Sequence, residues 1–162
     1  MSKFKNPQRD ELFKTIPKVS LDDLSHNLPE RCKFNFSYFC VPDGKTGFEV
    51  WSHENLLEFI NKLKEYCKKP LLEWTRQRVG RSGRSVLEIY GEFPRKSAYT
   101  FPMHVPHQAK WGRFRLGGSS RLCGFVVPDE YHGSVRGNGN HRFDCNTFYI
   151  VFIDDDHQFY LT

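Results

Sequence analysis

The sequence predicts an α+β fold, with helical segments in the first half of the chain packing on an antiparallel sheet formed by the last third. Two observations indicate this fold. Apolar residues recur at helical spacing in 56–67, whereas strand-like runs gather after residue 111. A length of 162 residues suits one domain. We therefore expect an N-terminal arm at 1–31 and a single α+β domain at 32–162.

The first elements are short. Residues 1–31 are polar and interrupted by three prolines, which favours an arm, with Ser20 as the N-cap of a short helix. Aromatic and polar residues alternate in 33–39, and this alternation predicts a half-buried strand. Residues 48–51 form either a second strand or an aromatic lead-in to the helix that follows.

The clearest helix begins after Ser52, a good N-cap residue, and ends before Pro70. Its apolar stripe should pack against the core, and the members of the stripe are Leu56, Leu57, Phe59, Ile60, Leu63 and Cys67. Residues 71–74 are compatible with a second short helix, and 76–84 with a basic, flexible loop.

The last third predicts the sheet. Residues 112–116 alternate arginine with apolar side chains, so we expect the arginines to point outward. A turn at 117–120 leads into a strand at 121–127, and a polar loop occupies 129–145. The near-continuous apolar run 147–153 is typical of a central strand covered on both faces.

Composition restricts the class of protein. The formal net charge is +5 and aromatic residues make up 15% of the chain, which excludes a largely disordered protein. No apolar run approaches the roughly 18–20 residues that span a bilayer, and no apolar segment typical of a signal peptide follows the N-terminus. The five cysteines lack a C-x-x-C pair. We expect a cytoplasmic protein with reduced cysteines and no membrane partner.

Two basic segments point to a polyanion. Neither contains an acidic residue, and their cations are Arg76, Arg78, Arg81 and Arg84 in the first, and Lys110, Arg113, Arg115 and Arg121 in the second. Arg113 and Arg115 share a strand face, and Arg121 returns on the next strand, so the three guanidinium groups should converge on a phosphate. Trp111 is a candidate for stacking on a base. The alternative is a solvated charge pattern at strand edges that discourages aggregation.

Other chemistries have weaker support. His132, His141 and Cys145 lie close in sequence but lack the paired spacing of a zinc site. No G-x-S-x-G elbow marks a hydrolase. The run 154–156 of three aspartates keeps a magnesium nuclease open as an option. The sequence thus predicts no resident metal or cofactor.

The C-terminal half resembles the RelE/ParE superfamily of toxins. The resemblance depends on four segments: 112–116 (GRFRL), 119–122 (SSRL), 148–153 (FYIVFI) and 156–160 (DHQFY). It implies helices on a curved antiparallel sheet whose basic face binds messenger RNA, usually on the ribosome. It also implies an acidic antitoxin as partner. The same pattern is similar to uncharacterised proteins of bacterial mobile elements.

The resemblance also implies roles for single residues. Arg121 matches the sheet arginine that contacts the scissile phosphate, and Arg113 and Arg115 match basic strand residues. His157 falls where some members have a general acid or base, and Tyr160 falls near a C-terminal aromatic. We expect the neighbouring aspartates to raise the pKa of His157.

Two hypotheses of function follow. The first is a metal-independent endoribonuclease that cleaves mRNA, alone or on the ribosome. Its catalytic candidates are Arg121, His157 and Tyr160, and its binding candidates are Lys110, Arg113, Arg115, Arg81, Arg84 and Trp111. The second is a non-catalytic module of a phage or mobile element that binds nucleic acid or a protein through the same surface.

Overall fold

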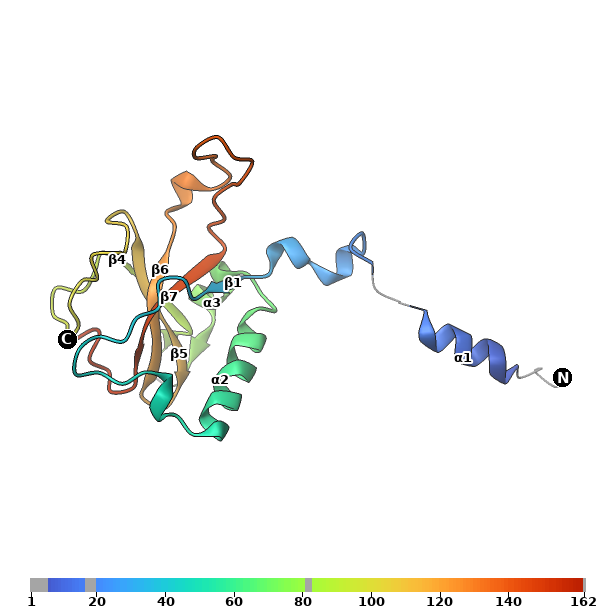
Figure 1. Cartoon of the computed structure of the whole chain (residues 1–162), viewed down its shortest axis with the longest axis horizontal. Helices are drawn as coiled ribbons and strands as arrows, with labels where there is room; N and C mark the ends of the chain where they lie inside the picture. Colours follow the sequence, from blue (N-terminus) through green and yellow to red (C-terminus); the bar gives the residue numbers. More distant parts are fainter. Residues whose placement is uncertain (1–5, 17–19, 81–82, 162) are drawn as a thin grey trace.

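The structure of this chain is a computed structural model that describes residues 6–16, 20–80 and 83–161. It contains helices and a five-stranded sheet in the order β1-β7-β6-β5-β4, which confirms the α+β fold class (Figure 1). The strands of this sheet are β1 (Lys33–Asn35), β4 (Leu87–Gly91), β5 (Lys110–Gly117), β6 (Ser120–Val126) and β7 (Thr147–Asp154).

The pairing of these strands is mixed. Strands β4 to β7 are antiparallel neighbours, as predicted, whereas β1 runs parallel to β7. β1 ends at Asn35, earlier than expected, because the Asn35 side chain accepts a hydrogen bond from the backbone N–H of Ser37 and turns the chain. β7 lies inside the sheet with apolar neighbours on both faces, as its composition predicted.

Helix α2 (His53–Tyr66) covers one face of the sheet. The Ser52 hydroxyl accepts a hydrogen bond from the backbone N–H of Asn55 at 3.2 Å, which confirms the predicted N-cap. The predicted stripe was partly wrong, because the buried residues of α2 are Phe59, Leu63 and Tyr66, whereas Leu57 and Ile60 are exposed. Aromatic residues before the helix cause this rotation, since the rings of Phe48 and Trp51 pack against Phe59.

The remaining short elements decide between the alternatives that the sequence left open. Residues Phe48–Val50 form a 3-10 turn, so they are a lead-in to α2 and not a strand. Helix α3 (Leu71–Arg76) confirms the second short helix. The prediction of a basic, flexible loop at 76–84 was partly wrong, because a small hairpin of β2 (Arg78–Val79) and β3 (Arg84–Ser85) forms there.

The core between the helices and the sheet is largely aromatic. Phe114 on β5 and Phe148 on β7 are fully buried, and their rings lie 5.0 Å apart. Tyr66 of α2 stacks on Phe114 at 4.8 Å. Leu71 and Trp74 bring α3 into the same cluster. This packing fixes α2 and α3 on one face of the sheet.

The opposite face of the sheet is also covered, as the apolar run 147–153 predicted, but the sequence did not indicate which segment covers it. The segment 92–109 lies across it, on the other side of the sheet from α2 in Figure 1. Tyr99 from this segment and Phe159 from the C-terminal end pack with Trp111 and Phe152 of the sheet. Trp111 is only 1% exposed, so its predicted role in stacking on a base is wrong.

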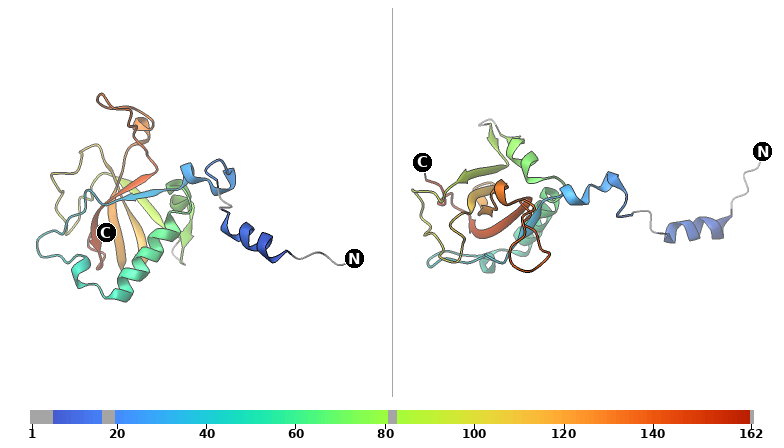
Figure 2. Two further views of the ribbon diagram at one scale, coloured as in Figure 1. Left: turned by 45° about the vertical axis from the view of Figure 1, so that its right-hand side comes forward. Right: turned by 90° about the horizontal axis from the view of Figure 1, so that it is seen from above.

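The N-terminal region lies apart from the sheet in both views of Figure 2. Helix α1 (Pro7–Thr15) has no buried residue. The expected helix at Ser20 is replaced by two 3-10 turns at Leu24–His26 and Leu28–Glu30, because the Asp23 carboxylate accepts from the Ser25 N–H and caps the first turn there. Within the described ranges, none of the helices combines the length and apolar character needed to cross a bilayer.

Candidate functional site

Three arginines gather at the end of the sheet next to the β5–β6 turn. Arg115 on β5 pairs in register with Arg121 on β6, and Arg113 lies two residues before Arg115. All three project from the face opposite α2, whereas Phe114 and Leu116 project toward α2. The structure thus brings these guanidinium groups into one cluster. They do not point into open solvent, since Arg113 is only 5% exposed and Arg121 only 3%.

Glu88 on β4 holds two of these arginines. Arg113 donates from Nε and Nη2 to Oε2 of Glu88 at 3.1 and 2.9 Å, and Nη2 of Arg115 donates to Oε1 at 3.2 Å. Partial burial raises the pKa of Glu88, but hydrogen bonds and charges from Arg113 and then Arg115 outweigh it and lower the pKa. Glu88 is therefore a carboxylate at neutral pH that neutralises one of two positive charges.

Among the residues that the structure describes, Arg121 has no such acidic partner. Its Nη1 donates to the backbone oxygens of Gly118 and Ser120 at 3.0 and 2.7 Å, and its Nη2 contacts Nε2 of His157 at 2.9 Å. Its Nε is buried and has no hydrogen-bond partner within the described ranges. Burial lowers the pKa of Arg121, and the charges of Arg115 and Arg113 lower it further. Because an arginine remains charged in proteins, Arg121 is a buried cation with a free N–H.

His157 is held in a strained conformation over Arg121. Its backbone φ is 58°, in the left-handed region that non-glycine residues rarely adopt. Burial lowers the pKa of its imidazole, and the charge of Arg121 lowers it further, although Asp154 opposes this. The expectation of a raised pKa was therefore wrong, because burial and the nearby arginines outweigh the opposing charge of Asp154. A neutral imidazole whose Nε2 accepts from Arg121 carries its proton on Nδ1.

The three consecutive aspartates serve different contacts. Asp154 is fully buried and accepts from the backbone N–H groups of Gln158 and Phe159, both at 2.9 Å, which fixes the turn that carries His157. Asp155 accepts from Trp51 and Ser120 on the opposite side of the sheet end. Asp156 is exposed. These carboxylates do not converge as magnesium ligands.

An open cleft lies beside the cluster. This arginine cleft has a volume of about 520 Å³ and is lined by Arg84, Glu88, Tyr90, Arg113, His157 and Tyr160. The Tyr90 and Tyr160 rings stack at 4.6 Å. The guanidinium of Arg113 lies 5.5 and 5.8 Å from the centres of these two rings. The cleft thus combines cations, an imidazole and aromatic rings, which are the groups that recognise a nucleotide phosphate and its base.

The other binding candidates are distributed differently. Arg84 is exposed and lines the arginine cleft. Lys110 lies at the far end of β5, where it faces Glu130 at 3.7 Å, so the structure does not bring it to the cluster. Arg81 lies outside the described residues.

Two residues of the cleft were missed by sequence reasoning. Glu88 and Tyr90 belong to β4, a strand that was not predicted. The stretch 86–90 does carry a signal, since Glu88 is the first acidic residue after a run of four arginines. The pairing of β4 with β5, which places Glu88 opposite Arg113, could only come from the tertiary structure.

The candidate zinc ligands also make other contacts. Nδ1 of His132 accepts from the backbone N–H of Cys145 at 3.3 Å, and His141 is exposed in the loop. All five cysteines are free thiols. Over the part of the chain that the structure describes, no three His, Cys, Asp or Glu side chains are arranged to hold a metal ion.

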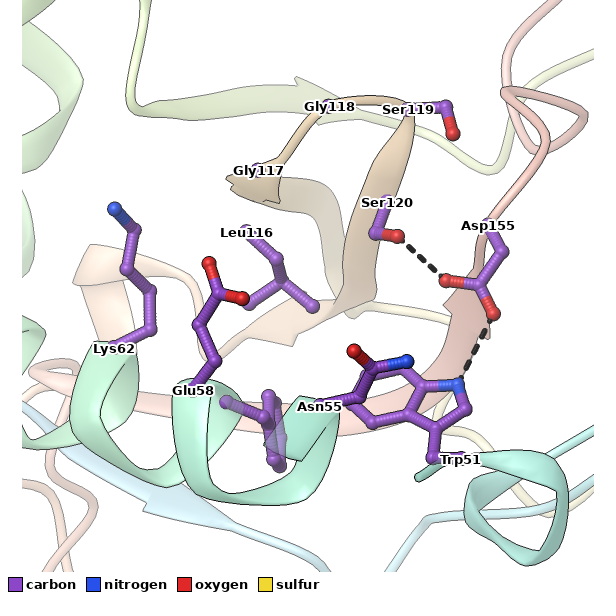
Figure 3. A pocket seen from close by; sticks show the side chains of 11 residues that line it. Trp51, Asn55, Glu58, Lys62, Leu116, Gly117, Gly118, Ser119, Ser120 and Asp155 are labelled. Atoms are coloured by element: carbon purple, nitrogen blue, oxygen red, sulfur yellow. Dashed lines mark hydrogen bonds between the residues drawn. The ribbon is translucent and has the colours of Figure 1, made fainter. Parts of the chain in front are cut away.

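A further cleft opens on the other side of the β5–β6 turn. It has a volume of about 480 Å³, and its wall includes Trp51 and Lys62 (Figure 3). Trp51 and Ser120 donate to the two oxygens of Asp155 at 3.2 and 2.7 Å, and these contacts close one end of the cleft.

Comparison with known proteins gives no relative from which a role could be transferred. No family model matches the chain, and neither a curated protein nor a solved structure matches it significantly.

Proposed function

We propose that this protein binds RNA at the arginine cleft and cleaves it without a metal ion, as a RelE-like endoribonuclease of the cytoplasm. The observation that carries the proposal is the contact of 2.9 Å between the buried Arg121 and His157, because His157 lines the arginine cleft together with Tyr160. These are the three residues that the sequence singles out for catalysis. Arg121 comes from β6 and contacts His157, and His157 and Tyr160, both from the segment after β7, line the same cleft.

Cleavage of RNA without metal uses the 2′-hydroxyl as nucleophile. The 2′-oxygen forms a bond with phosphorus and its proton passes to a base, while the bond from phosphorus to the 5′-oxygen breaks. The leaving 5′-oxygen takes a proton from solvent, which yields a 2′,3′-cyclic phosphate and a 5′-hydroxyl. Such a reaction needs a neutral base and a cation that stabilises the phosphate oxygens.

His157 and Arg121 fit these roles together. In the free protein, Nη2 of Arg121 occupies Nε2 of His157, and Nε of Arg121 has no partner. Nε and Nη2 form the side of the guanidinium that binds a phosphate with two parallel hydrogen bonds. A phosphate bound there takes both donors from Arg121, and the release of Nε2 makes His157 a base. The lowered pKa keeps His157 unprotonated and ready for this step near pH 7.

Tyr160 provides a surface for a base. One face of its ring stacks on Tyr90, while the side chain as a whole remains 40% exposed. Stacking on an aromatic ring holds nucleobases of any sequence. Tyr160 therefore positions the nucleotide next to the scissile phosphate, and Arg84 at the rim attracts the backbone.

The test is cleavage of a labelled single-stranded RNA by the full chain in EDTA, with and without ribosomes. We expect products with cyclic phosphate and 5′-hydroxyl ends. His157→Gln should lower the rate by about 10²–10⁴, and Arg121→Gln by about 10²–10³. Lys110→Ala at the far end of β5 is the matched control and should cleave like wild type.

Two further readouts separate chemistry from misfolding. The rate should rise with pH and level off below pH 6.5, because the pKa of His157 lies below this ordinary value. An RNA with a 2′-deoxy sugar at the cut site should stay intact. Cleavage that persists in a folded His157→Gln variant, or that stops in EDTA, would contradict the proposal.

A non-catalytic RNA-binding module is the second candidate. Its support is the resting geometry, in which Nε2 of His157 is occupied and Arg113 is paired with Glu88. Salt-sensitive binding of RNA without new ends, alone and with ribosomes, would favour this function over cleavage.

A further inference from the structure

A second basic cleft lies on the helical side of Arg121. It has a volume of about 430 Å³ and is bounded by α2, α3 and the β5–β6 turn. We call it the lysine cleft, and the charged residues that line it are Lys62, Glu65, Lys69, Arg115 and Arg121. Lys62 and Lys69 supply the positive charge that favours an anion here, because the guanidinium groups of Arg115 and Arg121 bind Glu88 and His157 on the other face of the sheet.

The positive charge of the lysine cleft is poorly neutralised by the protein itself. Lys62 takes part in none of the ion pairs found among the described residues. Lys69 faces Glu73 at 3.4 Å, but both side chains are about half exposed, so this pair holds the lysine weakly. Glu65 pairs with Lys68, which lies outside the cleft, but both side chains are more than half exposed, so this pair is also weak and Glu65 offsets one of the two lysine charges.

The two clefts share a wall. Arg121 lines the lysine cleft, and its Nη2 contacts His157, which lines the arginine cleft. Arg115 likewise lines the lysine cleft and donates to Glu88 of the arginine cleft. The buried Nε of Arg121, which has no partner, lies in this shared wall. A chain of phosphates in one cleft is therefore adjacent to cations of the other.

We propose that the lysine cleft is a second phosphate-binding site, which holds the RNA backbone on the far side of Arg121 from the cleavage site. This inference extends the proposed function, because the RNA that is cut in the arginine cleft continues into the lysine cleft. Lys62 and Lys69 bind phosphates there as mobile point charges. Tyr66 and Trp74, whose rings pack against each other at 5.0 Å, also line this cleft.

The test measures binding of a 2′-O-methyl RNA decamer to the full chain at several salt concentrations. The methyl groups remove the nucleophile, so binding is measured without cleavage. For the double variant Lys62→Ala and Lys69→Ala, the slope of log affinity against log salt should fall by about 1.4, or about 0.7 per phosphate contact. The matched control changes Lys64 and Lys14, two exposed lysines outside the cleft, of which Lys64 lies on α2.

A gain of charge gives an independent check. Gln77 lines the lysine cleft and is exposed, so Gln77→Lys should tighten binding of the decamer and steepen its salt dependence by about 0.7. Circular dichroism and the melting temperature verify that each variant is folded. Wild-type affinity and slope in both the folded double variant and Gln77→Lys overturn the second site.

A dinucleotide separates this inference from the proposed function. It has a single phosphodiester and reaches only the arginine cleft, so the double variant should cleave it at the wild-type rate. Binding of the decamer that depends on Lys62 and Lys69, without cleavage of any substrate, supports the lysine cleft and contradicts the nuclease. Cleavage of the dinucleotide, together with decamer binding that does not depend on these lysines, supports the nuclease and contradicts the lysine cleft. If the protein neither cleaves RNA nor binds the decamer through these lysines, both proposals are wrong.

Discussion

The two faces of the five-stranded sheet are built from the same strands but bury different kinds of side chain. On β5, Phe114 and Leu116 point toward α2 into a core with no charged member, whereas Arg113 and Arg115 point to the other face. That second face is divided, with an aromatic cluster around Trp111 at one end and the arginine cluster at the other. Both faces are buried, so alternate side chains along β5 differ in polarity and charge but not in their exposure to solvent.

This difference shows where stability and function are placed. The helical face is stabilised by apolar area that is removed from water, which needs no particular partner. The arginine face is stable only while each buried cation keeps its acceptors. A face of that kind costs stability when a single partner is removed, and it is also the face on which a phosphate can replace a partner.

The largest expected loss of stability comes from a substitution on the helical face of the sheet. Phe114→Ala removes a fully buried ring that contacts Tyr66 and Phe148, and should cost about 3–5 kcal/mol in the free energy of unfolding. Urea denaturation measures the loss. Leu57→Ala, on the exposed side of α2, should change stability by less than about 0.5 kcal/mol. Equal losses for the two variants would show that the assigned buried face of α2 is wrong.

The next largest loss of stability comes from a substitution on the arginine face. Glu88→Gln keeps the shape of the side chain but removes the charge that faces Arg113 and Arg115, and should cost about 1.5–3 kcal/mol. The same denaturation experiment applies. Glu92→Gln, an exposed residue just past β4, should stay within about 0.5 kcal/mol of wild type. A neutral effect of Glu88→Gln would mean that the arginines are solvated and not held by this carboxylate.

A smaller effect probes the aromatic wall of the arginine cleft. Tyr160→Ala removes the ring that stacks on Tyr90 and should cost about 0.5–1.5 kcal/mol, as measured by the melting transition. Tyr160→Phe preserves the ring and should match wild type in stability. If Tyr160→Ala melts like wild type, the stacked pair does not order the C-terminal segment.

The smallest effect is the pH dependence that His157 introduces. Because its pKa is lowered in the folded protein, the unfolded chain binds more protons between that pKa and about 6.5, so stability falls as the pH falls through this interval. His157→Gln removes this contribution. The difference between variant and wild type in denaturation midpoints from pH 8 to pH 5 isolates it, and parallel curves would contradict the lowered pKa.

Much of the fold follows from local patterns. The N-cap at Ser52 and the strands at 112–116, 121–127 and 147–153 are fixed by short-range rules of capping and alternation, which depend on neighbouring residues. The elements that were missed or misjudged, β4 and the extent of β1, have short or irregular patterns. Their existence depends on a partner strand that lies far away in sequence.

The candidate site divides in the same way. The sequence by itself determined that Arg113, Arg115 and Arg121 share a face, because residues two apart on a strand point the same way and the β5–β6 turn fixes the register. It could not determine that these arginines and Trp111 are buried, since the covering segment 92–109 has no regular period. Only the tertiary structure set Glu88 against Arg113 and His157 over Arg121. Burial and charge pairing are properties of segments brought together in space, and these contacts decide the pKa of His157 and the acceptors of each guanidinium.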